Sequence, residues 1–121
     1  QASYDIGYQV ITMDEYKELG HEKCSKMILD RLGDNPIYVT FDLDCLDATV
    51  APGTANLEPA FRGFNIDEAR KLIQSLKGKN VISGDVACLM PTKDSPNQIT
   101  SMVAASIMFE IICLISLNLN K

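Results

Sequence analysis

The hydrophobic and polar positions along the chain alternate between short strand-like runs and longer helix-like segments. Residues 36–42 are rich in β-branched and aromatic side chains, and residues 81–86 have the same character, so both segments predict strands. Tyr8–Ile11 predicts a further short strand. Helical segments separate these runs. Strands that alternate with helices are typical of an α/β fold, in which helices cover both faces of a parallel sheet.

The first predicted helix begins after Thr12 and ends near Arg31. Thr12 is a favourable helix N-cap, and Glu15 stands three positions later, which is the spacing of a capping box. Gly20 predicts a bend or break within this helix. The Gly-Asp-Asn-Pro sequence at 33–36 predicts its end.

Two further helices are predicted toward the carboxyl end of the chain. The first runs from Asn65, its N-cap, to Gly78. Its buried stripe consists of apolar residues at helical spacing: Ala69, Leu72, Ile73 and Leu76. The second is predicted to open at Ser95 and Pro96, as N-cap and first helical residue.

The last predicted helix is unusually apolar. From Ile99 to Leu117 only Glu110 is charged, and a segment of this length approaches a membrane span. A charge near the middle of a span is costly, and the segment also contains several serines. These features favour a helix that is buried against protein, with a membrane-spanning helix as the alternative interpretation.

Length and composition are those of one small domain, or of a piece of a larger one. The chain has 121 residues, of which 46% are hydrophobic and 22% charged. It begins at Gln1 without a methionine, so we expect that part of a longer protein precedes it or that the chain was processed. The formal net charge of −5 argues against a nucleic-acid partner, because no basic stripe is present to neutralise phosphates.

The cysteines are widely spaced and form no Cys-x-x-Cys pair; they are Cys24, Cys45, Cys88 and Cys113. This spacing favours free thiols in a reducing compartment over a disulfide framework or a zinc site. We therefore expect a cytoplasmic protein, with a mitochondrial location left open.

Two acidic residues stand where the strand at 36–42 gives way to a long loop, residues 43–63. Residues two apart on a strand point the same way, so Asp42 and Asp44 predict a pair of carboxylates on one face. In α/β proteins, ligands bind outside the carboxyl ends of the strands. Two carboxylates this close repel each other unless a cation lies between them, so the pair predicts a divalent metal site.

The sequence Phe-Asp-Leu-Asp-Cys-Leu-Asp at 41–47, followed by Ala-Pro-Gly-Thr at 51–54, resembles the ureohydrolase family, which includes arginases, agmatinases and formimidoylglutamases. Residues 84–86, Gly-Asp-Val, with Pro91 downstream, resemble the second active-site strand of that family. The resemblance implies a three-layer arginase-like α/β fold, with helices on both faces of a parallel sheet. It also implies that residues 1–121 are the C-terminal part of a single ureohydrolase-like domain.

The resemblance further implies a binuclear manganese site with Asp42 and Asp44 as ligands. A hydroxide formed there attacks an amidino or guanidino carbon of a small substrate. The resemblance assigns Thr54 and Cys88 to substrate binding, and Asp47 and Asp85 to structural roles at the site. No catalytic residue is assigned within this segment. The implied partners are the small substrate, the remainder of the domain and further copies of the chain, with no nucleic acid and no membrane.

Several positions depart from the family pattern. The family's histidine-containing metal motif is absent, and the single histidine, His21, is predicted to be a surface residue. Cys88 stands where the family has a glutamate that receives the guanidinium, and a thiol cannot replace that charged acceptor. Ala48 replaces a proline, and the loop after Gly53 is altered, with Glu58 as a candidate substitute carboxylate.

Two functions therefore stay open at this stage. The first is an amidinohydrolase of altered substrate preference, which the intact pair Asp42 and Asp44 favours. The second is a ureohydrolase-like subunit without catalysis, which Cys88 and the altered loop favour. Two carboxylates cannot hold two metals tightly, so this segment alone is expected to be inactive.

Overall fold

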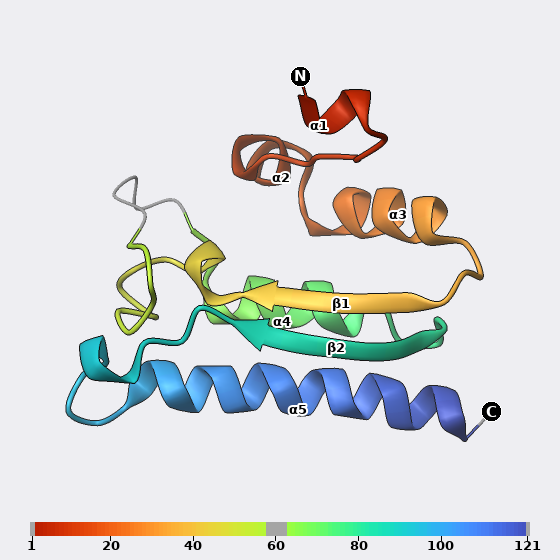
Figure 1. Ribbon diagram of the computed structural model, residues 1–121. Helices are drawn as coiled ribbons and strands as arrows, with labels where there is room; N and C mark the ends of the chain where they lie inside the picture. Colours follow the sequence, from red (N-terminus) through yellow and green to blue (C-terminus); the bar gives the residue numbers. More distant parts are fainter. Residues whose placement is uncertain (1, 58–62, 121) are drawn as a thin grey trace.

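The computed structural model describes residues 2–57 and 63–120 (Figure 1). In chain order the elements are α1 (Ala2–Asp5), α2 (Met13–Leu19), α3 (His21–Leu32), β1 (Ile37–Asp42), the 3₁₀ turn η1 (Leu43–Cys45), α4 (Ile66–Gln74), β2 (Val81–Ala87), the 3₁₀ turn η2 (Pro91–Lys93) and α5 (Ile99–Leu119). This order confirms the predicted α/β class.

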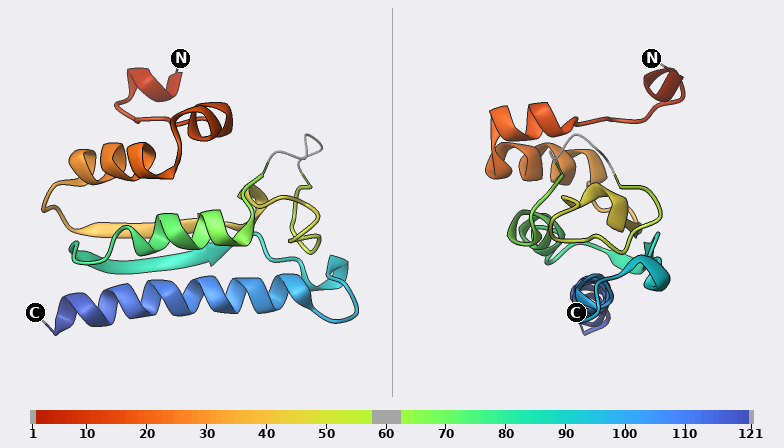
Figure 2. Two further views of the ribbon diagram at one scale, coloured as in Figure 1. Left: turned by 180° about the vertical axis from the view of Figure 1, so that it is seen from behind. Right: turned by 90° about the vertical axis from the view of Figure 1, so that its left-hand side faces the viewer.

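β1 and β2 form a parallel two-stranded sheet, and α4 is the crossover helix between them. Thr40 lies opposite Asp85, and Asp42 lies opposite Ala87, so both strands end at the same edge. Parallel strands need such a crossover, because the chain must return to the starting edge of the sheet before the second strand begins, and a short hairpin turn joins only antiparallel strands. The sheet thus brings the segments after β1 and β2 side by side (Figures 1 and 2).

The hydrophobic core lies between one face of this sheet and the helices α4 and α5. Val39 and Phe41 of β1 and Val86 of β2 pack against it. Its buried members come from β1, η1, α4, β2, α5 and the segments that follow η1 and α4: Ile37, Leu43, Leu46, Ala51, Ala69, Ile73, Leu76, Val81, Val103, Ala104, Ile107, Ile111 and Leu114. The alternate residues of the strands point the other way, and Tyr38 and Ile82 are 59% and 55% exposed.

α5 packs closely on the sheet at Gly84. A Cβ atom at this position would lie 2.6 Å from the carbonyl oxygen of Val39 and 2.8 Å from Cγ2 of Ile111. Both distances are shorter than a carbon atom tolerates, so the glycine is what lets α5 approach β2 at this depth.

We expect Gly84→Ala to destabilise the fold by about 1–3 kcal/mol, the usual cost of overpacking a tight core. The matched control is Ser83→Ala, because Ser83 is the preceding residue of β2 and points to the opposite face. Urea unfolding measures both free energies. Equal free energies of unfolding for the two variants would contradict the close approach at Gly84.

The helix signals before β1 and at Asn65 are confirmed. The Oγ1 atom of Thr12 accepts a hydrogen bond from the Glu15 amide, and the Glu15 carboxylate accepts one from the Thr12 amide. Gly20 separates α2 from α3 with a φ of 83°, so the predicted bend is a full break. Gly33 ends α3, and Asn65 forms a second capping box with Glu68.

The strand predicted at Tyr8–Ile11 is wrong. In the described part of the chain these residues have no regular secondary structure and pair with no strand, and Tyr8 is 65% exposed. A strand needs a neighbour to satisfy its ladder of hydrogen bonds, and a β-branched sequence does not supply one.

The predicted start of the last helix is also wrong. α5 begins at Ile99, with Gln98 as its N-cap in the left-handed region, at φ 55°. Ser95 instead donates a hydrogen bond from its Oγ to the side chain of Asn97 within the preceding turn.

α5 has the length and composition of a helix that could cross a membrane, and 28% of its most apolar window is buried in the structure. The buried residues recur every three or four positions, as expected for a helix with one face on a core: Thr100, Val103, Ala104, Ile107, Ile111 and Leu114. This packing supports the interpretation of a helix buried against protein. The expectation that the chain has no membrane partner stays a prediction.

Candidate metal site at the strand ends

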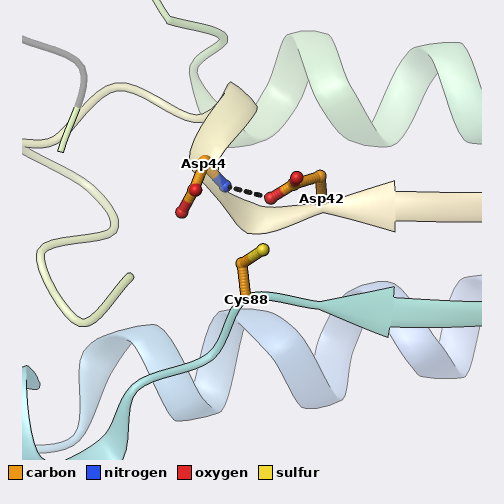
Figure 3. A group of neighbouring side chains, drawn as sticks. All are labelled: Asp42, Asp44 and Cys88. Carbon is orange, nitrogen blue, oxygen red and sulfur yellow. Dashed lines mark hydrogen bonds between the residues drawn. The ribbon is translucent and has the colours of Figure 1, made fainter. Parts of the chain in front are cut away.

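Asp42 and Asp44 lie together where β1 ends. Asp42 is the last residue of the strand, and the chain then turns into η1, which contains Asp44. The Asp42 carboxylate stabilises this turn, because its Oδ1 accepts a hydrogen bond of 2.9 Å from the Asp44 amide (Figure 3). The two carboxylates lie close together, as the sequence predicts, but the turn brings them there and not the alternation of side chains along one strand.

Cys88 joins this pair from the neighbouring strand. It follows β2 directly, with a left-handed backbone at φ 67°, and faces the two carboxylates across the gap between the strand ends (Figure 3). One carboxylate oxygen of each aspartate and the Cys88 sulfur all lie within 4.8 Å of one another. Asp42 is exposed, while Asp44 and Cys88 are half-buried. We name these three residues the strand-end cluster.

The thiol in the strand-end cluster is neutral at physiological pH. A hydrogen bond to the Asp42 carboxylate raises the pKa of Cys88 to about 11, with burial and the charges of Asp42 and Asp44 adding to the effect. Burial, together with the charge of Asp42, raises the pKa of nearby Cys45 to about 12. Neither sulfur is therefore a ready thiolate ligand.

The cluster fits a hard divalent cation in part. Its ionised donors are carboxylate oxygens, which suit manganese or magnesium better than thiophilic metals. Among the described residues, Asp42, Asp44 and Cys88 are the only group of three potential ligands close enough to share an ion. Two carboxylates are fewer ligands than a binuclear site requires.

The loop that carries Thr54 lies against the segment after β2. Thr54 forms an antiparallel bridge with Leu89, and the amide of Ala55 donates a hydrogen bond of 3.0 Å to the Cys88 carbonyl. The Thr54 side chain is buried, and its hydroxyl donates to the Asn56 carbonyl at 3.4 Å. The structure thus brings Thr54 next to the cluster through its backbone, with its side chain turned inward.

Asp47 and Asp85 lie outside the strand-end cluster. Oδ1 of Asp47 accepts hydrogen bonds from the amide and hydroxyl of Thr49, which is the loop-shaping turn that the sequence predicts. Asp85 is not a cap of the following turn. It accepts hydrogen bonds from the hydroxyls of Tyr38 and Thr40 on β1 and so links the two strands. These hydrogen bonds lower the pKa values of both carboxyls.

His21 is more buried than predicted. Its side chain is half-buried at the start of α3, its Nδ1 has no hydrogen-bond partner among the described residues, and its Nε2 lies 3.4 Å from the Ser25 hydroxyl. It lies outside the strand-end cluster. The proposed substitute carboxylate, Glu58, lies outside the described residues.

One residue with a strongly lowered pKa, Asp94, has no counterpart in the sequence-based predictions. Asp94, four residues before the N-cap of α5, accepts hydrogen bonds from the amides of Thr100 and Ser101 at 3.0 and 2.9 Å. Burial opposes its charge, but the bonds from Ser101 and Thr100 outweigh that effect and hold the pKa of Asp94 well below its usual range. The sequence signal that could have predicted this role is an acidic residue just before a helix, where a negative charge stabilises the helix N-terminus.

A pH dependence follows from this lowered pKa. Because the folded pKa is below the unfolded value, the Asp94 charge stabilises the fold above about pH 4 and loses that effect as pH falls further. We expect Asp94→Asn to lower Tm by several degrees at pH 7, and by progressively less as pH falls below 4. Thermal unfolding followed by circular dichroism measures both values. A difference in Tm that is the same at pH 7 and pH 3 would contradict the prediction.

The chain matches the model of the arginase family over residues 1–114. This chain belongs to the arginase family. It is 34% identical to the agmatinase of Photorhabdus laumondii over 110 residues, which are 91% of this chain and 35% of that protein. It is 34% identical to the agmatinase of an Enterobacter strain over 89% of this chain and 34% of that one.

Solved structures of arginase-family proteins superpose on the chain. The proclavaminate amidino hydrolase of Streptomyces clavuligerus has a TM-score of 0.89 and 29% identity, covering 98% of this chain and 40% of that one. A hypothetical agmatinase of Burkholderia thailandensis has a TM-score of 0.81 and 33% identity, covering 89% and 33%. The arginase-like fold predicted from the sequence is confirmed. The chain spans about a third of the length of the curated relatives that it matches.

Proposed function

We propose that the chain forms the C-terminal part of a metal-dependent hydrolase that cleaves a C–N bond in a small linear guanidino or amidino compound. The observation that carries the proposal is the placement of Asp42 and Asp44 side by side at the end of β1. Membership of the arginase family supports it, as does similarity to an agmatinase and an amidino hydrolase.

In this proposal Asp42 and Asp44 hold part of a binuclear manganese centre. The bound metals would supply a water molecule of lowered pKa for attack on the amidino or guanidino carbon. The hydrogen bond between Asp42 and the Asp44 amide fixes one carboxylate relative to the other. The remaining ligands would come from the rest of the domain, because the described residues offer no further ligand beside the two carboxylates except the Cys88 thiol.

The metal content of the complete protein tests this proposal. Protein prepared with manganese is expected to contain about two metal ions per chain and to release urea or a related product from a guanidino substrate. Elemental analysis and a colorimetric urea assay with agmatine and arginine measure the two quantities. If manganese-supplemented protein contains no metal, the proposal of a metal-dependent hydrolase is wrong.

A catalytically inactive family member is the second candidate, and Cys88 favours it. The neutral thiol of Cys88 faces the carboxylates at the position that the family resemblance assigns to the substrate guanidinium. In that case the protein binds metal weakly or not at all, turns over neither substrate, and acts as a structural or regulatory subunit.

In protein that hydrolyses agmatine, Cys88→Glu tests whether position 88 receives the substrate guanidinium. A carboxylate can form a charge-assisted pair with a guanidinium, so we expect KM for agmatine to fall about tenfold or more. The left-handed backbone at this position costs about 1–2 kcal/mol for a non-glycine residue, and Cys88 already carries that cost. Cys88→Gln is the matched control, because it has the same size without the charge. Equal KM values for the two variants would exclude this role for the position.

A further inference from the structure

The first turn of α5 is tied to the loop that follows η1. Thr100 is completely buried, and its Oγ1 accepts a hydrogen bond of 2.9 Å from the Gly53 amide. The amide of the same residue donates a hydrogen bond of 3.0 Å to Oδ1 of Asp94. Thr100 therefore links the Gly53 backbone, which its hydroxyl binds, to the Asp94 carboxylate, which its amide binds.

Gly53 is also packed directly on Asp94. A Cβ atom added to Gly53 would lie 2.8 Å from Cβ and 2.9 Å from Cα of Asp94, so no larger residue fits without movement. Asp94 in turn accepts hydrogen bonds from the Ser101 amide and hydroxyl at 2.9 and 2.8 Å. The loop, the carboxylate and the helix start therefore form one connected, partly buried polar unit.

This unit contacts both segments that carry the strand-end cluster, the one after β2 and η1. The Gly53 carbonyl accepts a hydrogen bond of 2.8 Å from the Met90 amide, and the Cys88 carbonyl accepts one of 3.0 Å from the Ala55 amide. On the other side, the Asn56 amide lies 3.4 Å from Oδ1 of Asp44 and donates to it. The loop at 53–56 thus contacts the segment after β2 and the carboxylate of η1 at the same time.

We propose that Thr100 and Asp94 are positioning residues for the strand-end cluster: they fix the loop at 53–56 to the start of α5, and the loop sets the distance between Asp44 and Cys88. Neither residue touches the cluster itself. They act through the backbone of residues 53–56, in the way that outer-shell hydrogen bonds orient the ligands of metal sites. The effect of these residues on metal affinity rests on the proposed function. Their effect on the order of the loop does not.

Three variants of the complete protein test the inference. Thr100→Val removes the hydroxyl and keeps the shape, whereas Thr100→Ser restores the hydroxyl. Ser106→Ala is the matched control on the same helix, because Ser106 is exposed and its hydroxyl donates only to the Met102 carbonyl one turn before it. Two quantities are measured well below Tm: the Kd for Mn²⁺ and the hydrogen exchange rates of peptides that cover residues 53–57 and 88–90.

We expect Thr100→Val to raise the Kd for Mn²⁺ about tenfold and to speed exchange in both peptides. Thr100→Ser is expected to return both quantities to within about twofold of the wild type, and Ser106→Ala to leave them unchanged. Faster exchange that is confined to the first turn of α5, with an unchanged Kd, would overturn the inference and leave Thr100 a purely structural residue. If the wild-type protein binds no Mn²⁺, the proposed function fails, and the exchange rates alone decide the inference.

Discussion

Replacing Asp44 with asparagine is expected to abolish manganese binding by the complete protein and to reduce hydrolysis by a hundredfold or more. The substitution keeps the size of the side chain and removes its charge, and hard divalent cations depend on ionised oxygen ligands. Changes outside the first ligand shell already cost metal sites about 10- to 100-fold in affinity, so the loss of a ligand costs at least as much. Asp42→Asn is expected to have the same effect.

Asp67→Asn is the control for this experiment. Asp67 is an exposed aspartate that lies in the first turn of α4 and pairs with Lys71. Its removal is expected to leave metal content and activity within about twofold of the wild type, since an exposed ion pair contributes little. Elemental analysis and the urea assay provide the readouts. An Asp44→Asn protein that keeps its manganese would show that this carboxylate is not a ligand.

Ile111→Ala is expected to cost about 2–5 kcal/mol of the free energy of unfolding, the largest stability effect that we predict in the chain. Ile111 is completely buried, and its Cγ2 lies against Gly84, which has no side chain to fill the space that the truncation leaves. Urea denaturation measures the effect.

The next residue of α5 gives the matched comparison. Ile112 is 53% exposed, so Ile112→Ala removes the same atoms from a position that faces away from the core. We expect its cost to be below about 0.5 kcal/mol. A similar cost for both variants would mean that the face of α5 bearing Ile112 is covered in the complete protein as firmly as the face on β2.

Local signals in the sequence predicted local structure well. The capping boxes at Thr12 and Asn65, the break at Gly20 and the strands at 37–42 and 81–87 all depend on residues within a few positions of one another. The pairing of Asp42 with Asp44 is of the same kind, because one strand end and one turn are enough to produce it.

The features that the sequence did not reveal depend on contacts between distant segments. Tyr8–Ile11 has strand-forming residues, but only a neighbouring strand could make it one. Asp94, rather than Ser95, secures the start of α5, because the chain winds back and presents the carboxylate to amides six and seven residues further on. The hydrogen bond from the Gly53 amide to the Thr100 hydroxyl joins residues that are 47 positions apart, and no periodic pattern in the sequence predicts such a contact.

The parallel pairing of β1 with β2 also determines the order in which the site is completed during folding. The two carboxylates come together as soon as η1 closes, since they are neighbours in sequence. Cys88 and its loop contacts arrive only after the intervening chain has formed α4 and returned, and such non-local pairings form late. We therefore expect refolding, followed by pulsed hydrogen exchange, to protect η1 before the segment after β2. A metal ion added at early times would meet a pair of aspartates whose surroundings are still unfolded.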